Sequence, residues 1–172
     1  MKKELIIVLL LALVGAMGFA QTTSTQTVAL TVPSVAMLGN NGPSTMSLAL
    51  RQPALPGEAP QDSLPYTSAY LRYSSVVAES ATRSISVQMA SGIPAGTALS
   101  VAAIVPSGMG TASAPVTLAT TSAPLITAIS TCFTGTGPTD GANLSYVFKV
   151  VTPGSLRFAE NTPLTVTYTI SE

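Results

Sequence analysis

Apolar and polar side chains alternate strictly over the segment LTVTYTIS, residues 164–171. Its apolar side chains fall on one side, and Thr or Ser side chains fall on the other. A period of two places alternate side chains on opposite faces of an extended strand, so the segment is predicted to be a β-strand with one buried face. The apolar members are Leu164, Val166, Tyr168 and Ile170.

The same alternation recurs along the chain between turns rich in Pro, Gly and Ser. About eight or nine such segments at spacings of roughly 10 to 15 residues predict an antiparallel β-sandwich of the immunoglobulin-like or pilin-like type. A closed barrel is the alternative, because periodicity alone does not separate the two architectures. The predicted strands are residues 25–32 (continued after Pro33 by 35–38), 46–51, 66–75, 83–89, 98–105, 115–120, 124–131, 143–151 and 164–171.

The first 20 residues have the parts of a secretory signal peptide. Two lysines precede an apolar stretch at residues 5–14, and small side chains lead to a cleavage site after Ala20. We expect a signal peptide helix at residues 1–20 and a single β-sandwich domain at residues 21–172. An uncleaved anchor helix is the alternative, although the apolar stretch is shorter than the roughly 20 residues that cross a bilayer. The protein is therefore expected to be secreted, periplasmic or at the cell surface, with no membrane span after cleavage.

The chain has few groups that could carry out catalysis. Only 8% of its residues are charged, and histidine is absent. Without a basic patch, nucleic acid is not expected as a partner. Glu58, Asp62 and Asp140 lie in predicted loops where carboxylates can hold calcium, but isolated acids at such places are interpreted as solvated or turn residues. We predict a protein that is not an enzyme, with no catalytic residue, metal site or cofactor.

Cys132 is the only cysteine. A single thiol cannot form a bridge within the chain, so the favoured interpretation is a buried side chain that packs as a small apolar group. An intermolecular disulfide or a reactive thiol is the alternative. The absence of histidine removes the usual base for activating a thiol.

A tyrosine-rich segment is the candidate for ligand binding. Tyr66 and Tyr70 could share one face of their strand, and Arg72 lies beside them. Aromatic side chains on a sheet surface can stack on a sugar or on a neighbouring protein. The loop at residues 51–65 precedes this segment and contains four prolines, and long loops are often functional. A secreted module that binds glycan or protein is therefore one functional hypothesis.

Four segments resemble a group of small exported bacterial β-sandwich proteins, most of which are described as uncharacterised. These segments are VALTVPSVAML, RSISVQMASG, ISTCFTGTGPTDGANLSYVFKV and LTVTYTIS, and the block from Cys132 to Val150 is the most specific. A looser similarity links the chain to spore coat U-type and fimbrial subunits, although their usual disulfide is absent here. That similarity implies donor-strand exchange, in which the N-terminal strand of one subunit completes the sheet of the next.

The preferred hypothesis is an exported structural or surface protein, with itself or other surface subunits as partners. Strand edges would carry the assembly through main-chain hydrogen bonds, with apolar side chains filling the space behind them. Val28, Leu30 and Val32 are the candidates on the N-terminal strand. They are predicted to pair with the C-terminal strand carrying Leu164, Val166, Tyr168 and Ile170, either within one chain, which is the favoured case, or between chains.

Overall fold

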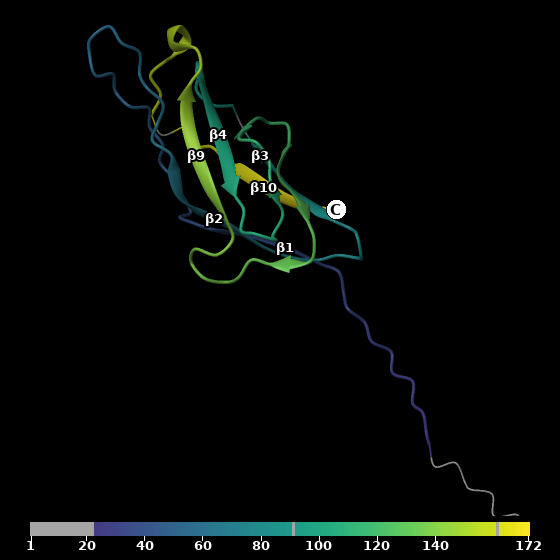
Figure 1. Cartoon of the computed structure of the whole chain (residues 1–172). Helices are drawn as coiled ribbons and strands as arrows, with labels where there is room; N and C mark the ends of the chain where they lie inside the picture. Colours follow the sequence, from purple (N-terminus) through teal and green to yellow (C-terminus); the bar gives the residue numbers. More distant parts are fainter. Residues whose placement is uncertain (1–22, 91, 161) are drawn as a thin grey trace, which may run out of the picture. The chain divides into compact units, whose positions relative to one another are not determined.

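The computed structural model describes residues 23–90, 92–160 and 162–172 (Figure 1). The predicted signal peptide, residues 1–20, lies outside the described residues. The chain divides into two units, one ending at Val32 and the other spanning Pro33–Glu172, and every assigned strand belongs to the second. Within the described part, no helix has the length and apolar character needed to cross a bilayer.

The described residues form ten β-strands and one short 3₁₀ helix, so the predicted all-β fold is confirmed. The elements are β1 (Val35–Asn41), β2 (Tyr66–Val76), β3 (Arg83–Met89), β4 (Thr97–Ile104), β5 (Thr111–Ala112), β6 (Val116–Thr117), β7 (Ala123–Ile129), β8 (Cys132–Phe133), β9 (Ala142–Val150), η1 (Pro153–Ser155) and β10 (Val166–Ser171).

The strands make two antiparallel sheets, as expected for a sandwich. The larger sheet has the order β1-β2-β9-β4-β6, and β8 also pairs with β2. The smaller sheet has the order β10-β3-β7-β5. Figure 1 shows the long central strands β9 and β4 side by side. The edge strands β1 and β10 belong to different sheets and lie next to each other.

One apolar core lies between the two sheets. Strand β3 illustrates how the sequence builds it, because every second side chain from Arg83 to Met89 is buried and those between are half-exposed. Burying a side chain such as Ile or Leu stabilises a fold by roughly 1.5–3 kcal/mol. The larger sheet contributes Ala69, Leu71, Tyr73, Leu99, Val101, Ala103, Ala142, Leu144 and Tyr146, and the smaller sheet contributes Ile85, Val87, Met89, Leu125, Ile126 and Ile129.

Two of the predicted strands are wrong. Residues 25–32 and residues 46–51 belong to no strand, apart from one bridge between Arg51 and Gln61. In the second segment the alternation is still informative, because Met46 and Leu48 pack against the core. Alternation in residues 46–51 thus marks side chains that pack against the core, whereas a strand also requires a neighbouring main chain with which to pair.

Candidate strand-pairing edges

Strand β10 is one edge of the smaller sheet and pairs with β3. Val166 lies opposite Met89, and Tyr168 lies opposite Val87. The β3 members of these pairs are buried, whereas the β10 members are only half-buried although they pack against the same core. The predicted apolar face of this strand is confirmed. Its outer margin remains partly open to solvent.

The main chain of β10 has a definite orientation. The Ala90 N–H donates to the Thr165 carbonyl oxygen at 2.9 Å, so the polar groups of Thr165 face β3. In an antiparallel ladder, the N–H and C=O of one residue point to the same side, and the side alternates along the strand. Thr167 and Thr169 therefore also face β3, whereas the main-chain groups of Val166, Tyr168 and Ile170 point to the open edge. These same residues direct their side chains into the sandwich.

Strand β1 is an edge of the larger sheet and is open in the same way. Thr134 donates its N–H to the Tyr73 carbonyl at 3.1 Å, so Tyr73 faces away from β1 and the next residue, Ser74, faces towards it. Ser74 pairs with Met37, and the main chain of the following residue, Leu38, therefore points to the open edge. The Leu38 side chain is half-buried against the core.

These two edges form what we call the seam. It consists of β1, β10 and their half-buried apolar side chains Leu38, Val166, Tyr168 and Ile170. Unpaired strand edges next to apolar side chains are the features to which an additional strand attaches. Apolar alternation in an added strand would match the seam, because its side chains would enter between the sheets.

A tyrosine pair closes the interior behind the seam. The hydroxyl of Tyr168 on β10 shares a hydrogen bond with that of Tyr146 on β9. Burial raises the pKa of both phenols, and for Tyr168 the nearby Tyr146 raises the pKa further. Both side chains therefore stay neutral at physiological pH and act in packing and hydrogen bonding.

The predicted N-terminal strand partner does not have the expected structure. Val28, Leu30 and Val32 are 69%, 89% and 81% exposed and belong to no strand. Within the described residues, the strand that pairs with β10 is β3. The pairing of β10 with the N-terminal segment stays a prediction. We call residues 25–32 the arm. Its apolar side chains occupy alternate positions and are exposed to solvent.

The tyrosine platform expected at Tyr66 and Tyr70 is divided between two faces. A β-bulge between Tyr66 and Ala69 shifts the register, so Tyr66 lies opposite the buried Tyr146 and packs against the core. Tyr70 lies opposite Asn143 on the outer face of the sheet. The prediction that Tyr66 and Tyr70 share one face is therefore wrong. The extra residue in the bulge reverses the direction of the side chains before it.

Arg72 lies on the same outer face as Tyr70, and its guanidinium already makes a hydrogen bond within the domain. Its Nη1 donates to the Thr136 carbonyl at 2.8 Å and holds the loop that joins β8 to β9. Asn41 on β1 donates to the Pro138 carbonyl of the same loop. The outer face around Tyr70 is thus bordered by a loop that two side chains fasten to the sheet.

The three acids considered for calcium each accept a main-chain N–H. Glu58 accepts from Leu55 at 3.2 Å, Asp62 accepts from Val150 at 2.8 Å, and Asp140 accepts from Gly137 at 2.6 Å. Each carboxylate thereby fixes a turn or loop, in keeping with its interpretation as a loop residue. No group of three or more potential metal-ligating acids, cysteines or histidines occurs within the part of the chain that the structure describes.

Cys132 is a free thiol with 6% of its surface exposed. Burial raises its pKa above the ordinary value, so the thiolate form is disfavoured as well as inaccessible. The residue lies opposite the buried Ser75 where β8 pairs with β2. The interpretation as a small packing side chain fits this environment.

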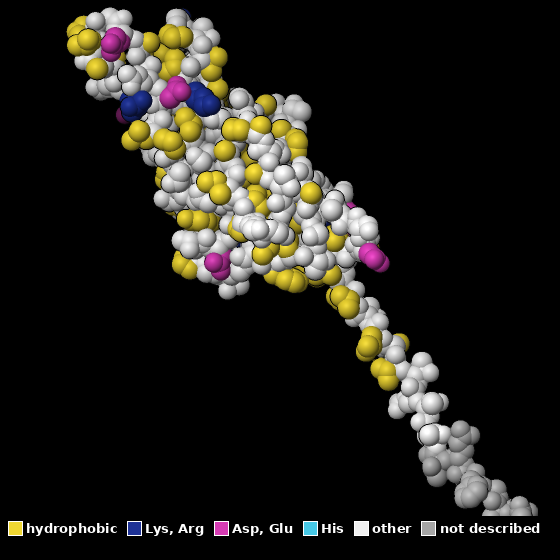
Figure 2. All heavy atoms as spheres, in the orientation of Figure 1, with side chains coloured by type: hydrophobic (Ala, Val, Ile, Leu, Met, Phe, Trp, Pro, Cys, Tyr) yellow, Lys and Arg dark blue, Asp and Glu magenta, His cyan; other side chains and the backbone are white. Residues whose placement is uncertain are grey.

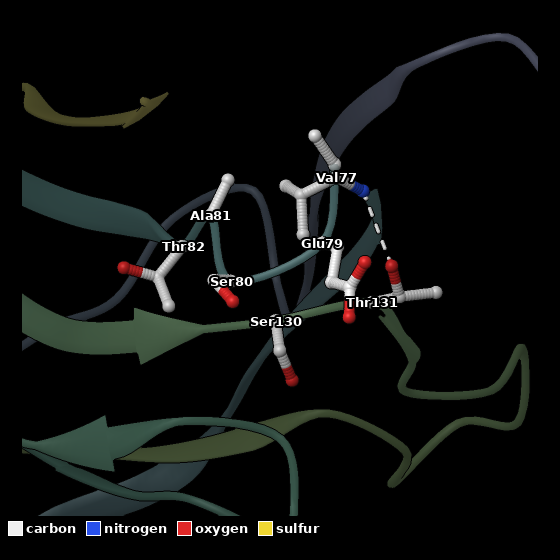
Figure 3. A pocket seen from close by; sticks show the side chains of 8 residues that line it. Val77, Glu79, Ser80, Ala81, Thr82, Ser130 and Thr131 are labelled. Atoms are coloured by element: carbon white, nitrogen blue, oxygen red, sulfur yellow. Dashed lines mark hydrogen bonds between the residues drawn. The ribbon is translucent and has the colours of Figure 1, made fainter.

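An open hollow of about 340 Å³ lies at the turn between β2 and β3. Figure 3 shows the side chains that line it. Small hydroxyl and apolar side chains line it together with Glu79, and the Val77 N–H donates to the Thr131 hydroxyl at 3.1 Å. No cluster of charged or aromatic side chains converges on it. The hollow therefore provides little to bind a specific ligand.

No protein-family model matches this chain, and comparisons with curated proteins and with solved structures find no match either.

Proposed function

We propose that the protein is an exported, non-enzymatic structural subunit of the pilin-like type that assembles with further copies at the cell surface. The observation that carries the proposal is the seam between β1 and β10. Two neighbouring edge strands both direct main-chain groups outward, and the half-buried Tyr168 and Ile170 lie behind one of them. Open strand edges of this kind promote pairing with other chains unless another strand covers them.

The arm of a second copy is the proposed cover. Its apolar side chains occur at every second position, which matches a strand that inserts one face between two sheets. Removing Val28, Leu30 and Val32 from water would contribute roughly 1.5–3 kcal/mol for each fully buried side chain. The main chain of the arm would add hydrogen bonds to the outward groups of Val166, Tyr168 and Ile170.

Low charge supports self-association. With 8% charged residues and equal numbers of acidic and basic groups, copies repel one another only weakly. Figure 2 shows few charged side chains on the face in view. Export is proposed on the basis of the N-terminal sequence pattern.

The test is the oligomeric state of the exported protein, measured by size-exclusion chromatography with light scattering. The variant Leu30→Asp should abolish assembly, because it places a charge on the apolar face of the arm. The matched control Thr31→Asp adds the same charge on the opposite face and should retain assembly. Deletion of residues 21–33 should give a folded monomer. A wild-type protein that stays monomeric at all concentrations refutes the proposal.

A binding module is the second candidate function, supported by the position of Tyr70. This side chain is half-exposed on the outer face of the larger sheet, beside Arg72. A tyrosine held on a flat sheet surface could stack on a sugar ring or on an apolar side chain of another protein. A glycan pull-down compares wild type with Tyr70→Ala. Equal retention of the two proteins refutes a role for this side chain.

A further inference from the structure

Arg83 is a buried cation at the start of β3. Its side chain is 5% exposed and follows the same alternation as Ile85 and Val87, so it points into the end of the sandwich. Burying a guanidinium is costly unless its N–H groups find acceptors. The acceptors that it finds indicate what the residue holds together.

The guanidinium reaches from the smaller sheet to the larger one. Its Nη1 donates to the Val35 carbonyl at the start of β1 and lies 3.3 Å from the Val76 carbonyl at the end of β2. The same nitrogen is 3.4 Å from the Ser75 hydroxyl. One side chain therefore holds the edge strand β1 to its neighbour β2.

The second nitrogen of the guanidinium holds the two chain segments that flank the seam. Arg83 Nη2 donates to the Ser34 hydroxyl at 2.7 Å, and that hydroxyl in turn donates to the Val76 carbonyl at 3.2 Å. Ser34 is two residues after the last residue of the arm. Nη2 also lies 3.7 Å from the carboxylate of Glu172, which directly follows β10. Arg83 thus contacts Ser34, which lies just after the arm in the sequence, and Glu172, which lies just after β10.

We propose that Arg83 is a positioning residue for strand exchange. It fixes the ends of β1 and β10 at the spacing that an incoming strand requires, and it holds Ser34 at the point where the domain begins in the sequence. This inference rests on the proposed function, in which the arm of one copy occupies the seam of the next. The residue does not contact the incoming strand and acts through the two edges that it holds.

Two variants test the inference in the whole exported protein. Arg83→Lys keeps the charge but cannot reach all of the acceptors of a forked guanidinium. Ser34→Ala removes only the hydroxyl at the base of the arm and leaves the remaining Arg83 contacts, so it stays informative if Arg83→Lys fails to fold. The matched control is Val101→Ala in β4, which is buried but distant from the seam in the sheet order and lowers stability without touching either edge.

The first readout is the rate at which isolated monomers assemble, followed by light scattering. Arg83→Lys should slow assembly about tenfold and Ser34→Ala about threefold, which corresponds to the loss of one or two hydrogen bonds that orient the edges. Val101→Ala should assemble at the wild-type rate under conditions that keep it folded. The second readout is hydrogen exchange at the amides of Val166, Tyr168 and Ile170, which assembly should protect in wild type and protect less in Arg83→Lys.

The outcomes separate the two proposals. If wild type assembles and Arg83→Lys and Ser34→Ala match its rate and protection, the positioning role is refuted while the proposed function stands. If Val101→Ala slows assembly as much as Arg83→Lys, the effect reflects stability and the positioning role is again refuted. If wild type does not assemble, both proposals fail together.

Discussion

The hydroxyl of Tyr168 on β10 shares a hydrogen bond with the hydroxyl of Tyr146 on β9, across the interior of the sandwich. Tyr146 is 1% exposed, so its hydroxyl has no access to water as a substitute partner. The bond joins the edge strand of the smaller sheet to a central strand of the larger one. It therefore contributes both to the stability of the fold and to the position of the edge that is proposed to accept a strand.

Replacing both phenols of this pair should cost no more stability than replacing one. Tyr168→Phe leaves the Tyr146 hydroxyl buried and unpaired, and the free energy of unfolding should fall by about 1–3 kcal/mol. The double variant Tyr146→Phe/Tyr168→Phe removes both polar groups, so it should be no less stable than the single variant. Urea unfolding measures both, with Tyr70→Phe on the outer face as the neutral control. A double variant whose loss equals the sum of the two single losses contradicts this coupling.

The buried tyrosines should make the protein sensitive to alkali. Burial raises the pKa of Tyr73, Tyr146 and Tyr168, so the native state keeps protons that the unfolded chain loses above about pH 10. Their contribution to stability is complete below that pH and is lost as the pH rises towards the native pKa values. Each tyrosine should lower the free energy of unfolding by up to about 1.4 kcal/mol per pH unit in this range.

The measurement is urea unfolding in steps from about pH 8 to pH 12. Cys132 should begin to contribute roughly one unit lower, because burial also raises the pKa of its thiol. The variant Tyr168→Phe removes one of the three groups and should make the decline shallower. Stability that stays constant up to about pH 12 would contradict the assignment of these tyrosines as buried and neutral.

The alternation in the sequence was sufficient to predict the central strands and their buried faces. Segments such as residues 83–89 and 143–151 carry enough apolar residues at period two to fix both strand and orientation. The same period of two also places Arg83 on the buried face of its strand, because it lies two residues before Ile85 and four residues before Val87. A charged side chain at an inward position indicates a buried contact, and that contact was missed.

Other features depend on partners that a single segment does not reveal. The arm alternates as regularly as a strand, but no alternation specifies whether an edge is available within the same chain. The position of Tyr66 depends on a bulge in the pairing of β2 with β9, which reverses its face relative to Tyr70. The two-residue strands β5 and β8 are too short for any period and are defined only by their neighbours, and β6 covers only two of the six residues predicted as a strand at 115–120.

Gly141 should not tolerate a side chain. Its φ is +106°, and a Cβ at this position would lie 2.3 Å from the Leu71 carbonyl oxygen on β2. Gly141→Ala should lower the free energy of unfolding by about 2–4 kcal/mol, because both the backbone conformation and the close approach of the two strands are disturbed. Gly154→Ala is the control, since its Cβ would meet no atom within 4 Å, and it should change stability by less than about 0.5 kcal/mol. Thermal unfolding followed by circular dichroism compares the two, and equal stabilities would contradict the contact with Leu71.

Proline substitutions at neighbouring positions of β10 should separate its two edges. The Val166 N–H points to the open edge, so Val166→Pro removes no hydrogen bond of the sheet and should cost only about 1 kcal/mol. The Thr167 N–H points to β3, so Thr167→Pro removes a ladder hydrogen bond and should cost about 3 kcal/mol or more. Urea unfolding gives both values, and the reverse order of the two losses would contradict the assigned orientation of β10.

The same pair distinguishes folding from assembly. Val166→Pro should remain a folded monomer in size-exclusion chromatography, because proline at the open edge cannot donate to the main chain of an incoming arm and its ring obstructs that side of the strand. A neutral substitution of similar size, Val166→Ile, retains the N–H and should assemble as wild type does. If Val166→Pro assembles equally well, the incoming strand does not bind along β10, and the β1 edge of the seam becomes the acceptor to be tested by proline at Leu38.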